Sequence, residues 1–279
     1  MRENFKKLSL IAAFVILFGD SISAQKQSVY RTLAFADEFN NSANAPVDSS
    51  KWTAEIGGEG WGNQELQYYT NSIENAYHDG NGSLVIKAIK MTDPLKLKCW
   101  YGQCQYTSAR LITKGKFDQK YGRFEARIKI PRSQGMWSAF WMLGNDIDKI
   151  GWAKCGEIDV MENIGREPTM VHGTIHGPGY SGGNAIGAPF SLKKKQIFAD
   201  DFHVYATEWS KNKLTFYVDG KLYKTIAPND IPQDSKWVFE HPFFMILNLA
   251  VGGPWGGNPD KTTVFPGEML VDYVRVYQR

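Results

Sequence analysis

The sequence contains little cysteine, with three residues at positions 99, 104 and 155 in a chain of 279. An odd count leaves at least one thiol unpaired. Cys99 and Cys104 are close enough in the chain for a local disulfide in an oxidising compartment. Cys155 would then remain unpaired and buried, and no zinc-ligand spacing accompanies it. The cysteines therefore predict one disulfide and give no sign of a zinc site.

Long apolar runs are also missing. Residues 8–18 form an apolar run of eleven residues, whereas a membrane-spanning helix needs about 20. Basic residues precede this run and small residues end it at Ala24, which is the pattern of a secretory signal peptide. No cysteine follows Ala24, which argues against a lipid anchor. We therefore expect residues 1–24 to be a leader, and the protein to be secreted to the periplasm or beyond the cell without a membrane anchor.

Neither sign of charge dominates. Lys and Arg total 32 and Asp and Glu total 29, and the leader holds three of these basic and two of these acidic residues. A nearly neutral chain predicts neither a nucleic acid nor an acidic polymer as partner, and it is compatible with a neutral polysaccharide. The chain has nine tryptophans. Indole packs on the C–H faces of sugar rings, although a β-sandwich core would also absorb some of these side chains.

Helical periodicity is scarce, and it is weakly present only in residues 191–200. Residues 121–130 instead alternate strictly, with Phe124, Ala126 and Ile128 on one face and charged residues on the other, as in an antiparallel strand with a wet side. Residues 214–226 predict a hairpin with a turn at Asp219–Gly220. About a dozen such short strands predict an all-β sandwich or barrel. No linker or repeat divides residues 25–279, so we expect a single domain.

Residues 156–163 place Glu157, Asp159 and Glu162 in a segment otherwise built from Ile, Val and Met. Such a segment favours a half-buried strand, where charge is costly. Glu157 and Asp159 share a face because side chains alternate. Glu162 would point away on a regular strand, and a one-residue bulge near Met161 would restore it to the carboxylate face. Bulges are frequent beside active sites.

With that bulge, Glu157 and Glu162 lie roughly 13 Å apart between Cα atoms. Their side chains could bring the carboxyls to about 5–6 Å, closer to the separation for a retaining glycosidase than for an inverting one. Three adjacent negative charges raise one another's pKa, so one carboxyl should keep its proton near neutral pH. The alternative is an exposed acidic strand or a calcium loop, but the segment lacks the Gly and Asn spacing of calcium loops.

The string from Glu157 to Glu162 resembles the bulged signature of glycoside hydrolase family 16. Residues 61–70, 135–143 and 248–253 resemble the bacterial laminarinases, which are endo-β-1,3-glucanases, and the likeness runs from about residue 33 to 277. It implies a concanavalin A-like jelly-roll β-sandwich with a concave substrate cleft. By the same resemblance Glu157 is the nucleophile and Glu162 the acid and base, while Asp159 orients Glu157. No cofactor is implied for catalysis.

Other residues are candidates for sugar binding. Trp137 and Trp141 are four positions apart on one apolar strand, so they share a face; the alternative is two core residues. His176 is expected on the neighbouring strand, near the carboxylates, or else on the surface. His172 shares its parity without support from the resemblance.

Asn63 and Arg110 match laminarinase positions that contact sugar hydroxyls, although loop or surface roles are the alternative. Asn248 lies on an apolar strand, where an amide needs hydrogen-bond partners from either backbone or sugar. The resemblance also implies a structural calcium ion at Glu38, Gly82 and Asp272, held partly by backbone oxygens, and oxygen ligands suit calcium.

The sequence thus predicts a secreted, monomeric, retaining endo-β-1,3-glucanase that binds β-glucan. Activity on mixed-linked β-1,3-1,4-glucan is left open. One rival is a galactanase of the agarase or carrageenase type, against which the bulge and the laminarinase-like strings argue. The other is a non-catalytic glucan-binding lectin, which would have no use for the three carboxylates.

Overall fold

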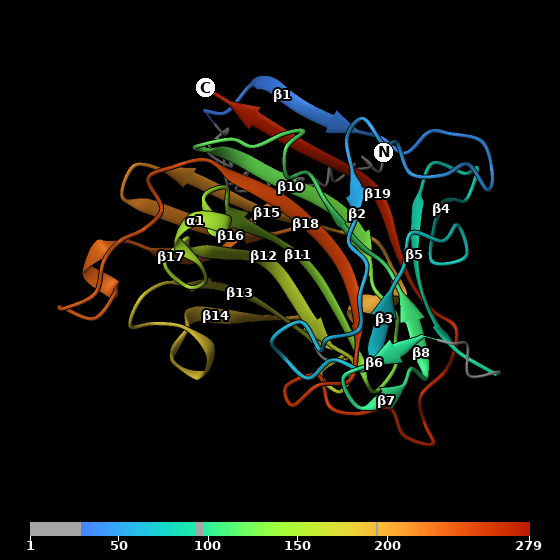
Figure 1. Ribbon diagram of the computed structural model, residues 1–279. Coiled ribbons are helices and arrows are strands. Elements are labelled where there is room, and N and C mark those ends of the chain that lie inside the picture. The colour runs from blue at the N-terminus through green and yellow to red at the C-terminus, as the bar shows by residue number, and fades with distance from the viewer. Residues whose placement is uncertain (1–28, 93–96, 194) are drawn as a thin grey trace, which may run out of the picture.

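The alternating strands pack face to face as a sandwich of two curved sheets in the computed structural model (Figure 1), which describes residues 29–92, 97–193 and 195–279. This is the expected jelly-roll arrangement. Among the described strands the pairing is antiparallel except between β3 (Gln67–Tyr69) and β8 (Tyr106–Ser108), which are parallel. The proposed leader lies outside the described residues and stays a prediction. Within the described ranges, no helix has the length and apolar character to cross a membrane.

One sheet carries the candidate site and is called the site sheet. Its seven strands follow the order β14 (Ile186–Ser191), β13 (Met170–His176), β12 (Glu157–Ile164), β11 (Met136–Gly144), β18 (Phe243–Val251), β9 (Arg110–Ile112) and β2 (Thr53–Ala54).

The opposite sheet, called the cover sheet, has ten strands. Its main path is β17 (Lys221–Ile226), β16 (Lys213–Val218), β15 (His203–Ser210), β10 (Gly122–Lys129), β19 (Gly267–Gln278), β5 (Leu84–Lys90), β8 (Tyr106–Ser108) and β3 (Gln67–Tyr69), while β1 (Thr32–Asp37) pairs with β19 and β4 (Ala76–His78) with β5. A separate two-stranded hairpin joins β6 (Lys98–Cys99) to β7 (Gly102–Gln103).

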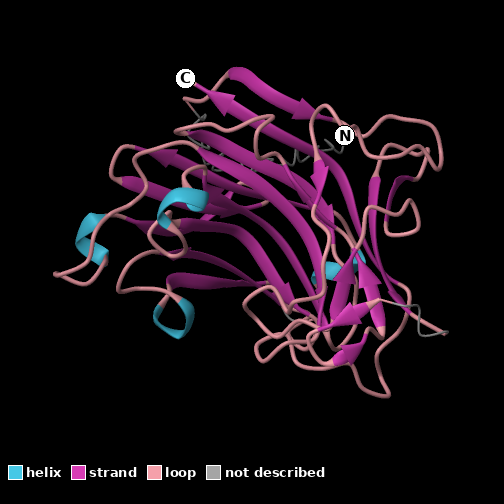
Figure 2. Cartoon of the chain, in the orientation of Figure 1, coloured by secondary structure: helices cyan, strands magenta, loops and turns pink. Residues whose placement is uncertain are grey.

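In the part of the chain that the structure describes, helices are confined to short connecting turns (Figure 2). They are α1 (Ile147–Ile150) and three 3₁₀ turns at Gly182–Asn184, Phe198–Asp200 and Pro228–Asp230. The weak helical pattern at residues 191–200 was a wrong indication, because Ser191 ends β14 and the described residues after it form only the turn at Phe198–Asp200. Phe198 is fully buried there and packs on Tyr205, so tertiary packing fixes this segment.

The core lies between the two sheets, where alternate residues of each strand meet. Phe124, Ala126 and Ile128 of β10 belong to it, as the alternation predicts. Phe140 and Met142 of β11 reach it from the site sheet. The β16–β17 hairpin turns where expected, and Asp219 and Gly220 both have positive φ (48° and 72°), as a two-residue hairpin turn with both central residues left-handed requires.

The disulfide between Cys99 and Cys104 is present, and Cys155 is free and buried, as predicted. The bridge closes the β6–β7 hairpin.

Phe140→Ala should lower the free energy of unfolding by about 3–5 kcal/mol, because it opens a cavity between the two sheets. Phe140 is fully buried in the main core. Urea unfolding measures the loss, and Leu222→Ala serves as a control because Leu222 is 57% exposed on β17. A loss for Phe140→Ala no larger than the control's would contradict the assignment of Phe140 to the core.

Candidate active site

A bulge in β12 sets the geometry of the site. Phe140 of β11 lies opposite Met161 and the next residue, Trp141, lies opposite Asp159, so Val160 is the extra residue. Val160 and Met161 are both packed in the main core. Two consecutive side chains thus face the core, and the inward–outward alternation continues from Glu162 on the outer side. Glu157, Asp159 and Glu162 therefore share the outer face of the site sheet. The bulge near Met161 is confirmed.

Glu162 receives a hydrogen bond from the next strand. The indole Nε1 of Trp137, on β11, donates to Oε1 of Glu162 at 3.0 Å. Trp137 is only 9% exposed, and Trp255 packs edge-on against it with ring centroids 5.1 Å apart. Trp137 therefore lies on the carboxylate face of the sheet, as predicted. Its hydrogen bond is to the carboxyl group of Glu162, and its contact with sugar stays a prediction.

Glu157 receives a matching hydrogen bond from Trp152, whose Nε1 donates to Oε2 at 2.7 Å. Trp152 lies in the segment between α1 and β12 and is 52% exposed. Sequence reasoning missed this residue, and the only signal was an indole five positions before a carboxylate in a loop. Gly156 directly precedes β12 with φ +73°, and a Cβ there would lie 2.9 Å from Phe243, so this position favours glycine.

His176, on β13, approaches the central carboxylate as predicted. Its Nε2 lies 3.2 Å from Oδ2 of Asp159 and 3.6 Å from Oε1 of Glu157. The backbone N–H of Gly182 donates to Nδ1 at 3.1 Å, so Nδ1 is the acceptor and Nε2 carries the hydrogen that faces the carboxyls. Asp159 itself is only 2% exposed.

Burial is the largest cause of a raised pKa at all three carboxyl groups, and neighbouring carboxyls add to it at the two glutamates. Burial raises the pKa of Glu157, and the neighbouring Asp159 raises it further, while His176 and the Trp152 hydrogen bond oppose the rise. Burial, followed by the charges of Asp159 and Glu157, raises the pKa of Glu162 well above its ordinary value. Burial also raises the pKa of Asp159. His176 and one indole donor oppose the rise at each glutamate, but two neighbouring carboxyls raise the pKa of Glu162 and only Asp159 raises that of Glu157. Glu162 is therefore best placed to keep a proton.

Glu157, Asp159 and His176 each place one ligand-type atom within 4.8 Å of the others. Two carboxyls and an imidazole can bind a divalent metal. The indole N–H donors at Glu157 and Glu162, however, are of the type that stabilises a carboxylate by hydrogen bonding. At Glu162, burial and two neighbouring charges outweigh the indole donor, so the arrangement can supply a nucleophilic carboxylate from Glu157 and a proton-donating carboxyl from Glu162 on the same face.

A polar and aromatic cluster lies beside the carboxylates and contains three of the predicted sugar-binding residues. The guanidinium of Arg110 lies over the rings of Trp61 and Trp141, 4.7 Å from each centroid, and its Nε pairs with Glu55 at 2.5 Å. Trp141 Nε1 donates to Oδ1 of Asn248 at 2.6 Å. Arg110 and Asn248 are also register partners across β9 and β18. The structure thus brings Arg110, Trp141 and Asn248 together.

A buried carboxyl group, Glu65, supports this cluster and was missed from the sequence. Its Oε2 accepts hydrogen bonds from Gln67 at 2.6 Å and from the hydroxyl of Tyr69 at 3.0 Å. Asn248 in turn donates to that hydroxyl at 3.1 Å, and Asn63 donates to Oε1 of Glu65 at 3.4 Å. Burial raises the pKa of Glu65. Asn63 therefore lies within the same network, although its contact with sugar stays a prediction.

His172 also lies on the site sheet, opposite Glu162 in the register. Its Nε2 is 2.8 Å from Oε2 of Glu167, and its ring packs edge-on against Trp255 at 5.3 Å. It therefore borders the carboxylate row, and Trp255 packs against both His172 and Trp137.

The predicted calcium ligands are brought near one another by the backbone. Strand β1 pairs with β19 up to Asp37 opposite Val274, and Gly82 lies beside Asn40. The carboxylate of Glu38, however, is held by Arg275 at 2.8 and 2.7 Å, and that of Asp272 by Arg127 at 2.6 Å. Both carboxylates are therefore ion-paired with arginines in this structure. The calcium site stays a prediction.

A β-sandwich with a bulge-aligned row of three carboxyls on one open sheet face defines a glycoside hydrolase. The model of the glycosyl hydrolases family 16 matches residues 61–275. The chain belongs to this family, as the signature in β12 predicts.

Comparisons with individual proteins agree with this. The chain is 40% identical over 292 residues to a beta-glucanase of Rhodothermus marinus, covering 99% of this chain and 96% of that one. It is 40% identical over 270 residues to glucan endo-1,3-beta-glucosidase A1 of Niallia circulans, covering 88% of this chain but 38% of that longer protein. The laminarinase catalytic domain of Thermotoga maritima superposes with a TM-score of 0.82 at 46% identity, covering 89% of this chain and 98% of that one.

Proposed function

We propose that this protein is an endo-acting hydrolase of β-1,3-linked glucans that retains the anomeric configuration. The observation that carries the proposal is the alignment of Glu157, Asp159 and Glu162 by the β12 bulge, with separate indole donors at the two glutamates. The similarity to a glucan endo-1,3-beta-glucosidase and to a laminarinase catalytic domain supports the substrate class.

The reaction follows from the protonation states. The Glu157 carboxylate attacks the anomeric carbon while Glu162 gives its proton to the leaving glycosidic oxygen. The bond to the leaving oxygen breaks, and an ester bond to Glu157 forms. Glu162, now a carboxylate, then takes a proton from water as the water attacks the same carbon, which releases Glu157 and restores the proton on Glu162.

Asp159 and His176 act on the two glutamates. Nε2 of His176 lies 3.2 Å from Asp159 and 3.6 Å from Glu157, close enough to offset part of the repulsion between the carboxyl groups. The charge of Asp159 raises the pKa of Glu162, which keeps the acid protonated at a higher pH. The central carboxyl therefore tunes the acid and positions the nucleophile.

The proposal includes secretion of a monomer without a membrane anchor. The Cys99–Cys104 disulfide supports an oxidising compartment, since disulfides are rare in the cytosol.

Product analysis tests the substrate and the mode of action. On laminarin, oligosaccharides should appear before glucose, because an open sheet face admits an internal stretch of chain. Lichenan, agarose and carrageenan are the comparison substrates. Glucose as the sole early product would contradict internal cleavage. Activity on a galactan without activity on any β-glucan would contradict the substrate, and binding without hydrolysis would indicate a lectin.

Replacing each glutamate by alanine in a separate variant tests their roles. Glu162→Ala should be rescued by azide with a β-glycosyl azide as product, because azide attacks the intermediate on Glu157 from the open face. Glu157→Ala with azide should give the α-azide, since the azide then occupies the vacated nucleophile position. Proton NMR of the products decides, and azides of the opposite configuration from the two variants would reverse the assignment.

Asp159→Asn should move the pH optimum downward. Removing a negative charge lowers the pKa of both glutamates, so the rising limb (ionisation of Glu157) and the falling limb (loss of the Glu162 proton) both shift to lower pH. The variant should also lose activity, by roughly 2–4 kcal/mol of barrier. The pH profile of kcat/KM measures the shift. An unchanged or raised optimum would show that Asp159 does not act on the glutamates through its charge.

A further inference from the structure

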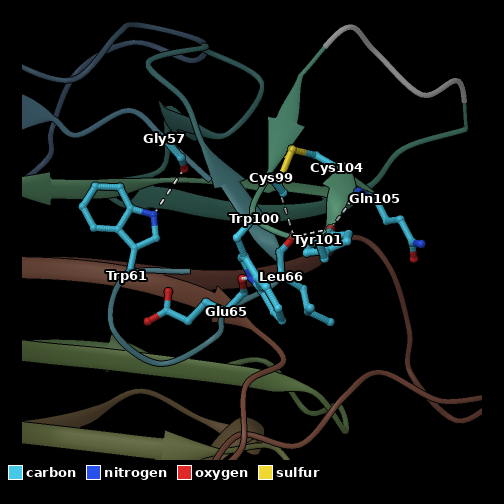
Figure 3. Close-up of a disulfide and its surroundings, with 9 residues drawn as sticks. All are labelled: Gly57, Trp61, Glu65, Leu66, Cys99, Trp100, Tyr101, Cys104 and Gln105. Carbon is cyan, nitrogen blue, oxygen red and sulfur yellow. Dashed lines mark hydrogen bonds between the residues drawn. A yellow bond between two sulfur atoms is a disulfide. The ribbon is translucent and has the colours of Figure 1, made fainter. Parts of the chain in front are cut away.

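The β6–β7 hairpin holds one exposed indole in a fixed place. Figure 3 shows Trp100 projecting from the hairpin next to the Cys99–Cys104 bridge and toward Glu65. Its backbone N–H donates to the carbonyl of Gly58 at 2.9 Å, and its Nε1 donates to the carbonyl of Glu65 at 2.8 Å. The ring orientation is therefore set at both ends, although the residue is 50% exposed.

Further contacts tie the hairpin down. The hydroxyl of Tyr101 donates to the carbonyl of Leu66 at 2.6 Å and accepts from the backbone N–H of Gln105 at 3.0 Å. One side of the Trp100 ring packs on Gly60, where an added Cβ would lie 3.0 Å from the indole. An indole that is hydrogen-bonded, packed on one side and left open on the other has the form of a stacking platform.

The open side of Trp100 lines a pocket of about 300 Å³, at the lower end of the size of ligand pockets. Its lining residues are Gln64, Leu66, Trp100, Gly253, Pro254, Gly257 and Asn258. The two amide side chains make no hydrogen bond to any other described residue. Gln64 has a positive φ of 51°, an unfavourable backbone state that persists where surrounding structure fixes it.

The pocket adjoins the candidate active site. A Cβ on Gly253 would lie 2.7 Å from the carbonyl of Asn63 and 3.7 Å from the ring of Trp137. Trp137 in turn donates to Glu162. Gly253 has φ +85°, so both its conformation and the close approach favour glycine. A chain bound along the carboxylates would reach this pocket by passing Gly253.

We propose that the pocket beside Trp100 is a distal sugar subsite, which stacks one glucosyl unit of the bound glucan on Trp100 and hydrogen-bonds it through Gln64 and Asn258. An aromatic face with two free amides has the chemistry that recognises a neutral sugar ring: C–H groups meet the indole, and hydroxyls meet the amides. This inference rests on the proposed glucanase activity and specifies how a long substrate is held.

Chain-length dependence tests the subsite. In Trp100→Ala, kcat/KM on laminarihexaose should fall about tenfold, the loss of one aromatic stacking contact. On the shortest laminari-oligosaccharide that the wild type cleaves, it should be unchanged, because such a substrate does not reach the pocket. Trp100→Phe should retain most of the activity on laminarihexaose. Leu222→Ala, an exposed apolar residue on β17, is the matched control and should change neither value.

A double variant tests the role of the disulfide. Replacing Cys99 and Cys104 together by Ser should lower kcat/KM on laminarihexaose, as Trp100→Ala does, since the hairpin then holds the indole less firmly.

The glucosyl unit in the pocket could come from the main chain or from a β-1,6 branch of the glucan. Laminarin with β-1,6 branches and unbranched curdlan oligosaccharides distinguish these two sources. For Trp100→Ala, a loss on both substrates is expected and would place the main chain in the pocket. A loss confined to branched laminarin would place a branch there and would overturn the predicted effect on laminarihexaose.

Binding distinguishes failure of the subsite from failure of the proposed activity. Calorimetry with laminarihexaose compares Glu157→Ala with Glu157→Ala/Trp100→Ala, and about tenfold weaker binding by the double variant is expected. Equal binding by the two, or equal losses on short and long substrates, overturns the subsite while hydrolysis by the wild type still stands. If the wild type cleaves no β-glucan and neither variant binds laminarihexaose, both proposals fail together.

Discussion

The extra residue at Val160 in β12 is the constraint on which the site depends. Without it, the side chain at position 162 would point into the core, where a carboxyl would be unpaired and costly to bury. With it, Val160 and Met161 both fill the core and the three carboxyls share the outer face. The bulge is stable because apolar side chains occupy both of its inward positions. The same bulge therefore determines both the packing of the core and the position of the three carboxyl groups.

The second requirement is to hold three carboxyl groups together while the two glutamates keep different protonation states. Each glutamate receives its own indole N–H, from Trp137 on β11 and from Trp152 in the loop before β12. The central carboxyl faces His176, whose hydrogen position is set by a backbone N–H from Gly182. These donors come from three different segments. The difference between the two glutamates therefore arises from their surroundings, since their side chains are chemically identical.

Beside the carboxylates, the buried Glu65 joins the loop at residues 57–66 to the site sheet and the disulfide hairpin. Its carboxyl accepts from Gln67 and Tyr69, and its backbone carbonyl accepts from Trp100. The Tyr69 hydroxyl also accepts a hydrogen bond from Asn248, which in turn accepts one from the indole of Trp141. Glu65 thus acts through two groups: its backbone carbonyl positions Trp100, and its carboxyl connects to Asn248 through Tyr69. The second connection gives a physical reason for placing a costly carboxyl there.

Much of this protein follows from the sequence by itself. The alternation in residues 121–130, the turn at Asp219–Gly220 and the carboxylate segment act over a few neighbouring residues, and so does the Cys99–Cys104 bridge. Local periodicity and spacing are enough to predict them. The bulge could be predicted because three carboxyls on an apolar strand have only one arrangement that keeps them all out of the core.

Only the tertiary structure decided which side chains surround those carboxyl groups and donate hydrogen bonds to them. Asn248 and Tyr69 are 179 positions apart, and Arg110 lies between Trp61 and Trp141 from two other segments. The donor from Trp152, the orientation of His176 and the pocket beside Trp100 likewise depend on how loops fold back onto the sheet. Such contacts leave no periodic signal, because they are fixed by the packing of distant segments and not by the residues next to them in the chain.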